Sequence, residues 1–397
     1  MNLRVVPLIA ITSILLFSVG CGKKNFRGES VMDNAPAHTK QGMKYWDDGR
    51  YQNAEEEFTR AQMLDQKYAP AYSGLALVTA KKAQDAKDQE SAEKVFNEAY
   101  KLADKAQELD NRLPFVYIAK SIVITMKYEV NPVKEWLMDV EDQYEKAIKL
   151  DPDNSEVYYR RGVFYKKVFE FSKASSDFRK VLDINKDYIV QANRQLEIVQ
   201  KIERAAPGTD IGKKIAIVDT ISRADIAALF ISELKLDKFV TKKRSATYDT
   251  NFIAPDDTRT MVVDSLVNTP AITDISTHWA RSFINDIVTL EIRGLEPYPD
   301  HTFHPDDLVN RGEYALTLED ALIAITGDTS LATRYIDTET RFPDVNPSHP
   351  AYNAICTLVD RGVMKTELTG AFGIEKTVSG PDALLIIREL KNNNKIK

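Results

Sequence analysis

Few side chains in this sequence have the type and spacing that catalysis or metal binding requires. His301 and His304 form a spaced histidine pair, but no third ligand lies nearby, so we expect no metal site. Cys356 lies between Ile355 and Leu358 in a helical pattern, which predicts a buried small residue and not a nucleophile. We find no glycine-rich phosphate loop and no serine nucleophile motif. The sequence therefore predicts a protein that has no enzymatic activity and needs no cofactor.

The overall composition is that of an ordinary globular chain. Of the 397 residues, 43% are apolar and 28% are charged, and the length predicts two or more domains. Lys and Arg total 53 against 59 Asp and Glu, a net charge of −6, which argues against nucleic-acid binding because that function needs a basic surface. Two cysteines are too few for a disulfide scaffold or a cysteine-rich zinc module.

The first twenty residues have the pattern of a secretory signal peptide. Arg4 provides a basic start, residues 5–17 are almost entirely apolar, and small residues precede Cys21. The apolar run is shorter than the roughly 20 residues that a spanning helix needs. A permanent membrane anchor is the alternative interpretation.

The sequence Ser-Val-Gly-Cys at residues 18–21 resembles a bacterial lipobox, although Ser18 stands where an aliphatic residue is usual. The resemblance implies cleavage before Cys21 and attachment of lipid to that cysteine. Several acyl chains hold a protein at a bilayer far better than one chain does. Gly22, in place of an aspartate, implies an outer-membrane location, where the protein would face the periplasm. Residues 21–35 are then predicted to form a flexible tether.

Residues 36–206 show a helical periodicity that contains an internal repeat. A small residue, an aromatic residue, a second small residue and an aliphatic residue fall on one helix face. Two of these sets are 34 residues apart, and a third lies nearer the start of the region. The three sets are Val140, Tyr144, Ala147 and Leu150; Ala174, Phe178, Val181 and Ile184; and Ala54, Phe58, Ala61 and Leu64.

This period resembles the tetratricopeptide repeat, which implies helix pairs stacked into a solenoid. We expect about four repeats, with a polar insertion at residues 81–90 and a break at residues 130–132. A generic array of amphipathic helices is the alternative. The family binds proteins on its concave face, and the resemblance implies that six residues point into this groove. They are Met43, Trp46, Tyr159, Val163, Lys166 and Lys167, for each of which an ordinary core or surface role is the alternative.

Three capping boxes predict three helix starts within residues 207–392. In each, a capping side chain precedes an acidic residue by three positions, and an apolar run follows. The pairs are Ser222 with Asp225, Asn310 with Glu313, and Ser379 with Asp382. Arg223 and Arg311 follow the first two capping residues, whereas Gly380 follows the third.

The motifs that lead to the second box resemble the S-layer homology module. They comprise Ile-Thr-Asp-Ile at residues 272–275, His-Trp-Ala at 278–280 and the loop at 298–305. We define copies 1, 2 and 3 as residues 207–236, 272–325 and 341–392. Copy 1 is partial, and the end of the repeats, near residues 191–204, is expected to supply its opening helix. The whole chain is thus predicted to be all-α, with a tetratricopeptide-type solenoid followed by a three-part helical spindle with irregular loops. The polar residues 242–268 are predicted to be an insertion.

The S-layer homology family binds cell-wall polysaccharide, often an acidic polymer, in grooves between copies. The arginine of the capping box is the usual contact, which implies this role for Arg223 and Arg311. A guanidinium matches a carboxylate with two parallel hydrogen bonds. A structural salt bridge is the alternative, and Gly380 implies that copy 3 has lost the contact. Trp279 is a candidate for stacking on a sugar, although a core position beside Ile284 is favoured.

These features predict a cell-envelope lipoprotein that acts as a tether or scaffold. Its partners would be the membrane through its lipid, cell-wall polysaccharide or peptidoglycan through the spindle, and an unidentified envelope protein through the repeats. One alternative is an accessory lipoprotein for secretion or pilus assembly, in which the spindle is only structural. Another is a glycan-processing enzyme, which turnover of cell-wall fragments would reveal.

Overall fold

The computed structural model describes residues 33–130, 136–240 and 272–394. Within these ranges the chain is helical, and its β-type pairing is confined to two isolated bridges, Ser222 with Leu308 and Asn310 with Thr377. The predicted signal peptide, Cys21, most of the tether and the insertion at residues 242–268 lie outside the described residues. No helix in the described ranges is both long enough and apolar enough to span a bilayer. The all-α class that the sequence predicts is confirmed.

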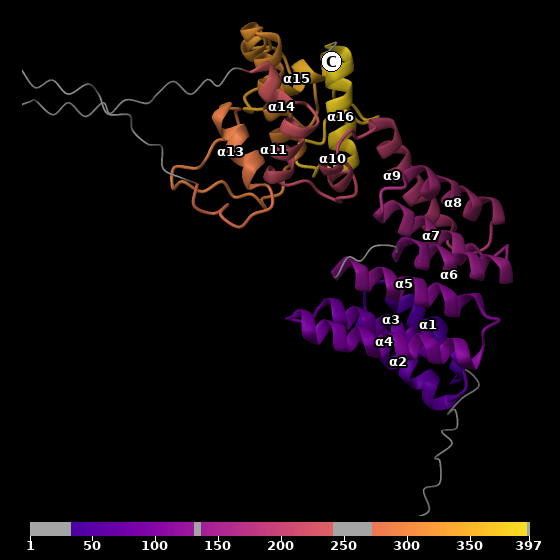
Figure 1. Cartoon of the computed structure of the whole chain (residues 1–397). Helices are drawn as coiled ribbons and strands as arrows, with labels where there is room; N and C mark the ends of the chain where they lie inside the picture. Colours follow the sequence, from indigo (N-terminus) through magenta and orange to yellow (C-terminus); the bar gives the residue numbers. More distant parts are fainter. Residues whose placement is uncertain (1–32, 131–135, 241–271, 395–397) are drawn as a thin grey trace, which may run out of the picture. The chain divides into compact units, whose positions relative to one another are not determined.

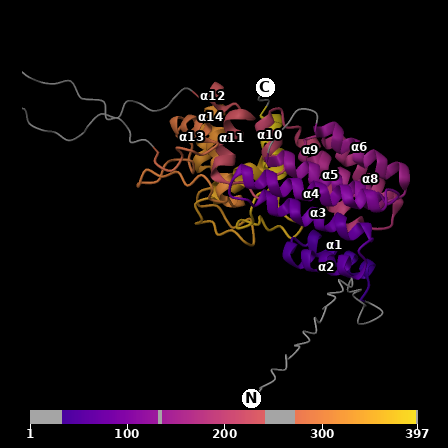
Figure 2. The ribbon, with the colours of Figure 1, turned by 60° about the horizontal axis from the view of Figure 1, so that its bottom comes forward.

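The chain divides into two compact units, residues 1–152 and 153–397. Unit 1 consists of stacked helical hairpins (Figures 1 and 2). Its helices are α1 (Ala35–Asp47), α2 (Tyr51–Leu64), α3 (Ala69–Gln84), α4 (Gln89–Leu109), α5 (Pro114–Val130) and α6 (Trp136–Leu150). The second helix of each hairpin buries one aromatic side chain, Phe58, Phe96 or Tyr144, which is at most 1% exposed.

Small residues on the neighbouring helices let these aromatic rings approach. A Cβ atom placed on Gly74 of α3 would lie 2.3 Å from the ring of Phe58, so this position accepts glycine alone without movement of the ring. Burial of such an aromatic side chain is a major part of the packing energy of each hairpin. The predicted pattern of small and aromatic residues is therefore the pattern of the hairpin core.

The expected polar insertion at residues 81–90 is wrong. Lys81 lies in the last turn of α3, only residues 85–88 connect the helices, and Gln89 begins α4. Helix α4 also carries the aromatic pattern, in Ala92, Phe96 and Ala99, which the sequence analysis did not identify. The reason is that α3, with 16 residues, and α4, with 21, are longer than the other helices of this pattern, so Phe96 lies 38 residues after Phe58 and 48 before Tyr144.

Unit 2 contains the last repeat helices and the three copies of the spindle. The repeat helices are α7 (Ser155–Lys167), α8 (Phe171–Ile184) and α9 (Ile189–Ala205). The spindle helices are α10 (Asp210–Ile215), α11 (Arg223–Ser232), α12 (Leu236–Phe239), α13 (Arg281–Thr289), α14 (Arg311–Thr326), the 3₁₀ helix η1 (Thr329–Thr333), α15 (Tyr352–Asp360) and α16 (Gly380–Asn393).

Helix α9 belongs to the repeats and to the spindle at the same time. It packs against α8 on one side and against α16 on the other (Figure 1). Its residues Ile202 and Ala205 are part of the same continuous core as the three copies, and Lys201 forms a 3.0 Å ion pair with Asp382. The expectation that residues 191–204 supply the opening helix of copy 1 is supported. This shared core explains why the compact units divide at Pro152, within the repeats.

The three predicted helix starts are confirmed. Helices α11 and α14 begin with reciprocal capping boxes, Ser222 with Asp225 and Asn310 with Glu313. At α16 the Ser379 hydroxyl accepts the N–H of Asp382 and donates to its carboxylate at 2.7 Å. Each cap satisfies backbone N–H groups that the first helical turn leaves without partners.

Candidate functional site

Arg223 lies in the first turn of α11 and joins copy 1 to copy 2. Its Nε donates to the carbonyl of Phe303 at 2.9 Å, Nη1 to that of Gly294 at 2.6 Å, and Nη2 to that of Glu296 at 3.1 Å. Its guanidinium carbon lies 4.7 Å from the centre of the Phe303 ring and 5.1 Å from that of Tyr298. The side chain thus closes the loop of the next copy, because a guanidinium has enough donors to bond several carbonyls at once.

Arg311 repeats this arrangement between copies 2 and 3. Its Nε donates to the carbonyl of Phe372 at 3.0 Å and Nη2 to that of Lys365 at 2.9 Å, and its guanidinium carbon lies 4.6 Å from the centre of the Phe372 ring. Burial lowers the pKa of this guanidinium. The nearby carboxylates of Asp382, Glu367 and Asp344 raise it, but by less. Both arginines donate to backbone carbonyls, and among the described residues neither forms the salt bridge that was the alternative. Their contact with a polymer stays a prediction.

The third junction uses the backbone in place of a side chain. A Cβ atom on Gly380 would lie 1.8 Å from the carbonyl oxygen of Ile215, which excludes any larger residue without movement of the chain. The Gly380 N–H donates to the carbonyl of Val218 at 2.9 Å. The corresponding amides of Arg223 and Arg311 donate to the carbonyls of Asp307 and Lys376. The three junctions therefore share a backbone hydrogen bond and differ in the side chain beside it.

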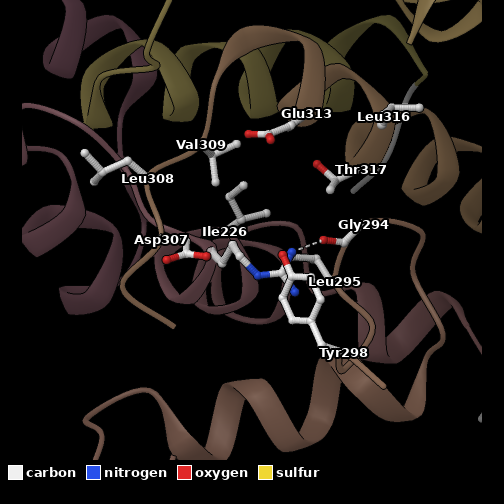
Figure 3. A pocket seen from close by; sticks show the side chains of 11 residues that line it. Ile226, Gly294, Leu295, Tyr298, Asp307, Leu308, Val309, Glu313, Leu316 and Thr317 are labelled. Atoms are coloured by element: carbon white, nitrogen blue, oxygen red, sulfur yellow. Dashed lines mark hydrogen bonds between the residues drawn. The ribbon is translucent and has the colours of Figure 1, made fainter. Parts of the chain in front are cut away.

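A groove with a volume of about 440 Å³ lies at the junction of copies 1 and 2. It is lined by Arg223 and Ile226 of copy 1 and by residues from the loop and helix α14 of copy 2. Figure 3 shows Tyr298 on one side of the groove, and Glu313 and Thr317 of α14 on the opposite side. Tyr298 is 42% exposed, which leaves part of its ring available to a ligand.

The electrostatics of this groove are mixed. Arg223 is its one lining cation, whereas Asp307 and Glu313 are its acids. The Glu313 carboxylate accepts the backbone N–H of Asn310 at 3.0 Å and so serves the helix cap. Arg223 uses three of its five N–H donors on carbonyls, which leaves two for a ligand. An aromatic ring beside a few polar groups is an arrangement that can bind a sugar through its apolar face and its hydroxyl groups.

Trp279 does not take the core position that the sequence favoured. Its side chain is 54% exposed and contacts the rings of His278 and Phe283, with ring centres 5.7 and 6.4 Å apart. Ile284, in contrast, is fully buried, because only one face of the short helix α13 turns toward the core. Trp279 does not line the groove at Arg223. The aromatic residue of that groove is Tyr298, which the sequence analysis quoted in a motif but did not select.

The histidine and cysteine side chains that were considered for metal binding or nucleophilic chemistry contact neighbouring residues of the fold. His304 lies 3.9 Å from the carboxylate of Asp307 and packs edge-on against the ring of Tyr298. The described residues contain no group of three or more His, Cys, Asp or Glu side chains placed to hold a metal ion. Cys356 is fully buried, as predicted, and desolvation raises the pKa of its thiol.

The six residues predicted to line the peptide groove lie on two helices. Met43 and Trp46 are on α1 of unit 1, where they are half-buried and pack against the hairpin core. The other four, Tyr159, Val163, Lys166 and Lys167, are on α7 of unit 2. The ring of Tyr159 stacks on that of Tyr188, with centres 4.8 Å apart, and Lys166 Nζ donates to Gln195 Oε1 at 2.6 Å. Their contact with a peptide stays a prediction.

Comparison with protein families identifies both types of module. A tetratricopeptide repeat matches residues 143–188, and an S-layer homology domain matches residues 271–315 and 341–383. The chain therefore contains a tetratricopeptide repeat followed by S-layer homology domains, in the order that the sequence predicts. Copy 1 is outside the matched ranges.

Two solved structures resemble about half of the chain. A thermophilic tetratricopeptide repeat protein of Thermus thermophilus is 17% identical, with a TM-score of 0.34, and the match covers 51% of this chain and 92% of that chain. PilF of Pseudomonas aeruginosa is 15% identical, with a TM-score of 0.19, and the match covers 44% and 93%. No curated protein matches the sequence.

The two module types define a coarse function. Tetratricopeptide repeats bind proteins, and S-layer homology domains bind the cell surface. Both are binding modules without catalytic activity of their own, which argues against an enzyme. The S-layer homology domains indicate an association with the cell surface or envelope, and the combination of the two module types supports a scaffold role there.

Proposed function

We propose that this protein is a lipid-anchored envelope scaffold that links a protein partner to cell-wall polysaccharide or peptidoglycan. The groove at Arg223 is the observation that carries the proposal. It brings the ring of Tyr298, two spare guanidinium donors and the carboxylate of Asp307 to one surface. A sugar stacked on Tyr298 would place its hydroxyl groups within reach of these polar atoms. Both module types are binding modules without catalytic activity of their own, which supports binding as the function of the groove.

The remaining parts of the proposal concern the two ends of the molecule. Lipid on Cys21 would hold the chain at a membrane, on the periplasmic face of the outer membrane, and residues 21–35 would give it reach. In the repeats, α1 of unit 1 and α7 of unit 2 are each a candidate contact for the partner. Linking three attachments in one chain raises the effective concentration of each partner for the others. Mass spectrometry of the protein purified from membranes tests the lipid, since an unmodified amino terminus would exclude it.

Sedimentation with isolated cell wall tests the groove. The mature chain should pellet with the wall, and Tyr298→Ala should lower the bound fraction about tenfold, since loss of one aromatic stacking contact and its desolvated area is worth roughly 1–2 kcal/mol. Tyr51→Ala is a matched control, because Tyr51 is similarly exposed, at 38%, but lies on α2 in the repeats. Binding that is unchanged in Tyr298→Ala would remove the groove from the proposal. No binding at all would favour the alternative in which the spindle is only structural.

Capture of the repeat partner needs the whole mature chain. Ile202 and Ala205 of α9 lie in the spindle core, so a fragment that ends at residue 206 would expose apolar surface and capture proteins nonspecifically. Cross-linking with the intact protein on membranes avoids this artefact. A partner whose capture is lost in Trp46→Ala or Tyr159→Ala, while wall binding is kept, would support the predicted peptide groove.

A further inference from the structure

A second cavity, with a volume of about 400 Å³, lies where the last repeat helices meet copy 3. Its walls come from α7, from α9, from the segment 216–219 and from the start of α16. All of these elements belong to unit 2. Ser379 and Pro381, the neighbours of Gly380, line it, so the cavity lies beside the junction that has no arginine.

Three cationic side chains from the repeat helices line this cavity. Lys166 of α7 donates to Gln195 at 2.6 Å, and Lys201 of α9 forms ion pairs with Asp382 at 3.0 Å and, more distantly, with Glu197 at 3.9 Å. Arg194, an exposed residue of α9, has no hydrogen-bonding or ion-pair partner among the described residues. Its five N–H donors are therefore available to a ligand.

The charge balance of this cavity is opposite to that of the groove at Arg223. Its lining has three cations and two acids, Glu197 and Asp219, whereas the groove has one cation and two acids. Burial lowers the pKa of Lys166, and the charges of Lys167 and Arg194 lower it further, while Asp219 raises it. Lys166 therefore senses the positive charge of Arg194 as well as the negative charge of Asp219, and an anion bound between Lys166 and Arg194 would be attracted by both cations.

The backbone at the start of α16 does not contribute donors to this cavity. The Gly380 N–H is bonded to Val218, Pro381 has no N–H, and the Asp382 N–H is bonded to the Ser379 hydroxyl. Recognition of an anion would therefore depend on the side chains of the repeat helices. Arg194 is the residue with the geometry for two parallel bonds to an oxyanion.

We propose that the cavity between α7, α9 and the start of α16 binds an oxyanion, a carboxylate or phosphate group, through Arg194, Lys166 and Lys201. This site is separate from the groove at Arg223 and does not depend on it. Where the bound group is the charged substituent of an acidic wall polymer, helices α7 and α9 supply the cations that hold it. The repeats would then contribute directly to the ligand specificity of the spindle.

Methyl NMR of the intact mature protein tests this site directly. Ile198 and Ile217 line the cavity, whereas Ile226 lines the groove at Arg223 and serves as an internal control. Titration with inorganic phosphate and, separately, with D-glucuronate should shift the methyl signals of Ile198 and Ile217 saturably and leave Ile226 unchanged. The probe that binds more tightly identifies whether the natural group is a phosphate or a carboxylate.

Arg194→Gln should weaken the binding of the tighter probe about tenfold, as expected for loss of one charge-assisted pair. Arg204→Gln is the matched control, because Arg204 is also an exposed arginine of α9 but does not line the cavity. The proposal is overturned if neither probe shifts the two methyl signals, or if Arg194→Gln binds as tightly as the unchanged protein. Because the test does not use cell wall, its failure is distinguishable from failure of the proposed function.

Discussion

The junctions of the spindle, where a helix start of one copy meets the next copy, are closed by two different kinds of contact. At Arg223 and Arg311 a long side chain bonds carbonyls of the next copy and lies against a buried aromatic ring. At Gly380 the absence of a side chain lets the helix start touch the backbone at Ile215. At Arg223 a groove lies beside the arginine side chain, whereas at Gly380 the two backbones touch. The comparison shows that a departure from the motif, here Gly380 in place of an arginine, can be required by packing.

A second consequence concerns the ligands that each junction can bind. At the first junction the arginine is largely occupied by carbonyls, and Tyr298 is the exposed recognition element. At the third junction the cations come from α7 and α9, outside the copies themselves. The end of the solenoid therefore acts as part of the spindle, both in the core and at its surface.

The largest effect is expected for Gly380→Ala. The new Cβ atom would lie 1.8 Å from the Ile215 carbonyl, so the first copy must move away from α16. We expect a loss of about 3 kcal/mol or more in the free energy of unfolding, measured by urea denaturation. Hydrogen exchange of α16 and of residues 215–218 should rise as well.

Gly208→Ala is the control for this change. A Cβ atom on Gly208 would lie 3.7 Å from Glu233 Oε2, an ordinary contact, so stability should change by less than about 0.5 kcal/mol. Equal stability of the two variants would show that the third junction is not closed by backbone contact.

An intermediate effect is expected for Arg223→Ala. Loss of the side chain leaves the carbonyls of Phe303, Gly294 and Glu296 without their donors, which should lower the free energy of unfolding by about 2 kcal/mol. Arg311→Ala removes bonds to two carbonyls and should cost less. The same urea denaturation measures both variants.

Arg223→Lys separates geometry from charge. A lysine keeps the positive charge but cannot reach three carbonyls in a fixed plane, so it should restore only a small part of the lost stability. Full recovery in this variant would mean that charge alone closes the first junction.

The smallest effect, and a dependence on pH, is expected for Asp344→Asn. The Asp344 carboxylate accepts the backbone N–H groups of Phe372, Gly373 and Ile374 at 2.8, 2.6 and 3.4 Å, beside the ring that Arg311 covers. Desolvation raises the pKa of Asp344, but these hydrogen bonds lower it more, and the net pKa lies below the ordinary value of 3.8. The substitution should cost about 1 kcal/mol at pH 7.

The sign of the pH dependence follows from the lowered pKa. A carboxyl group that is more acidic in the folded state stabilises the protein above its unfolded pKa, and this contribution is lost as the pH falls through the folded pKa. The difference between Asp344→Asn and the unchanged protein should therefore be constant from pH 7 to about pH 5 and shrink below pH 4. Urea denaturation across this range is the measurement, and a difference that grows on acidification would contradict the cause assigned here.

Local patterns in the sequence predicted much of the fold. The capping boxes at Ser222 and Asn310 were identified because cap and helix start are only three residues apart. The aromatic pattern around Phe58 and Phe178 was identified because hairpins of similar length repeat it. The pattern of helix α4 was not identified because both α3 and α4 are long, which changes the spacing on either side of Phe96.

The sequence by itself determined the all-α class, the order of the two module types and the helix starts, because these depend on hydrogen bonds and periodicities within a few turns of chain. Only the tertiary structure decided the partners of Arg223, the exposure of Trp279 and the role of Tyr298, because each depends on which distant loop passes beside it. The same holds for Gly380 and Arg194. Gly380 contacts Ile215, 165 residues away in the chain, and the cavity beside Arg194 is closed by Ser379 and Pro381, 185 and 187 residues away, and no local pattern encodes such contacts.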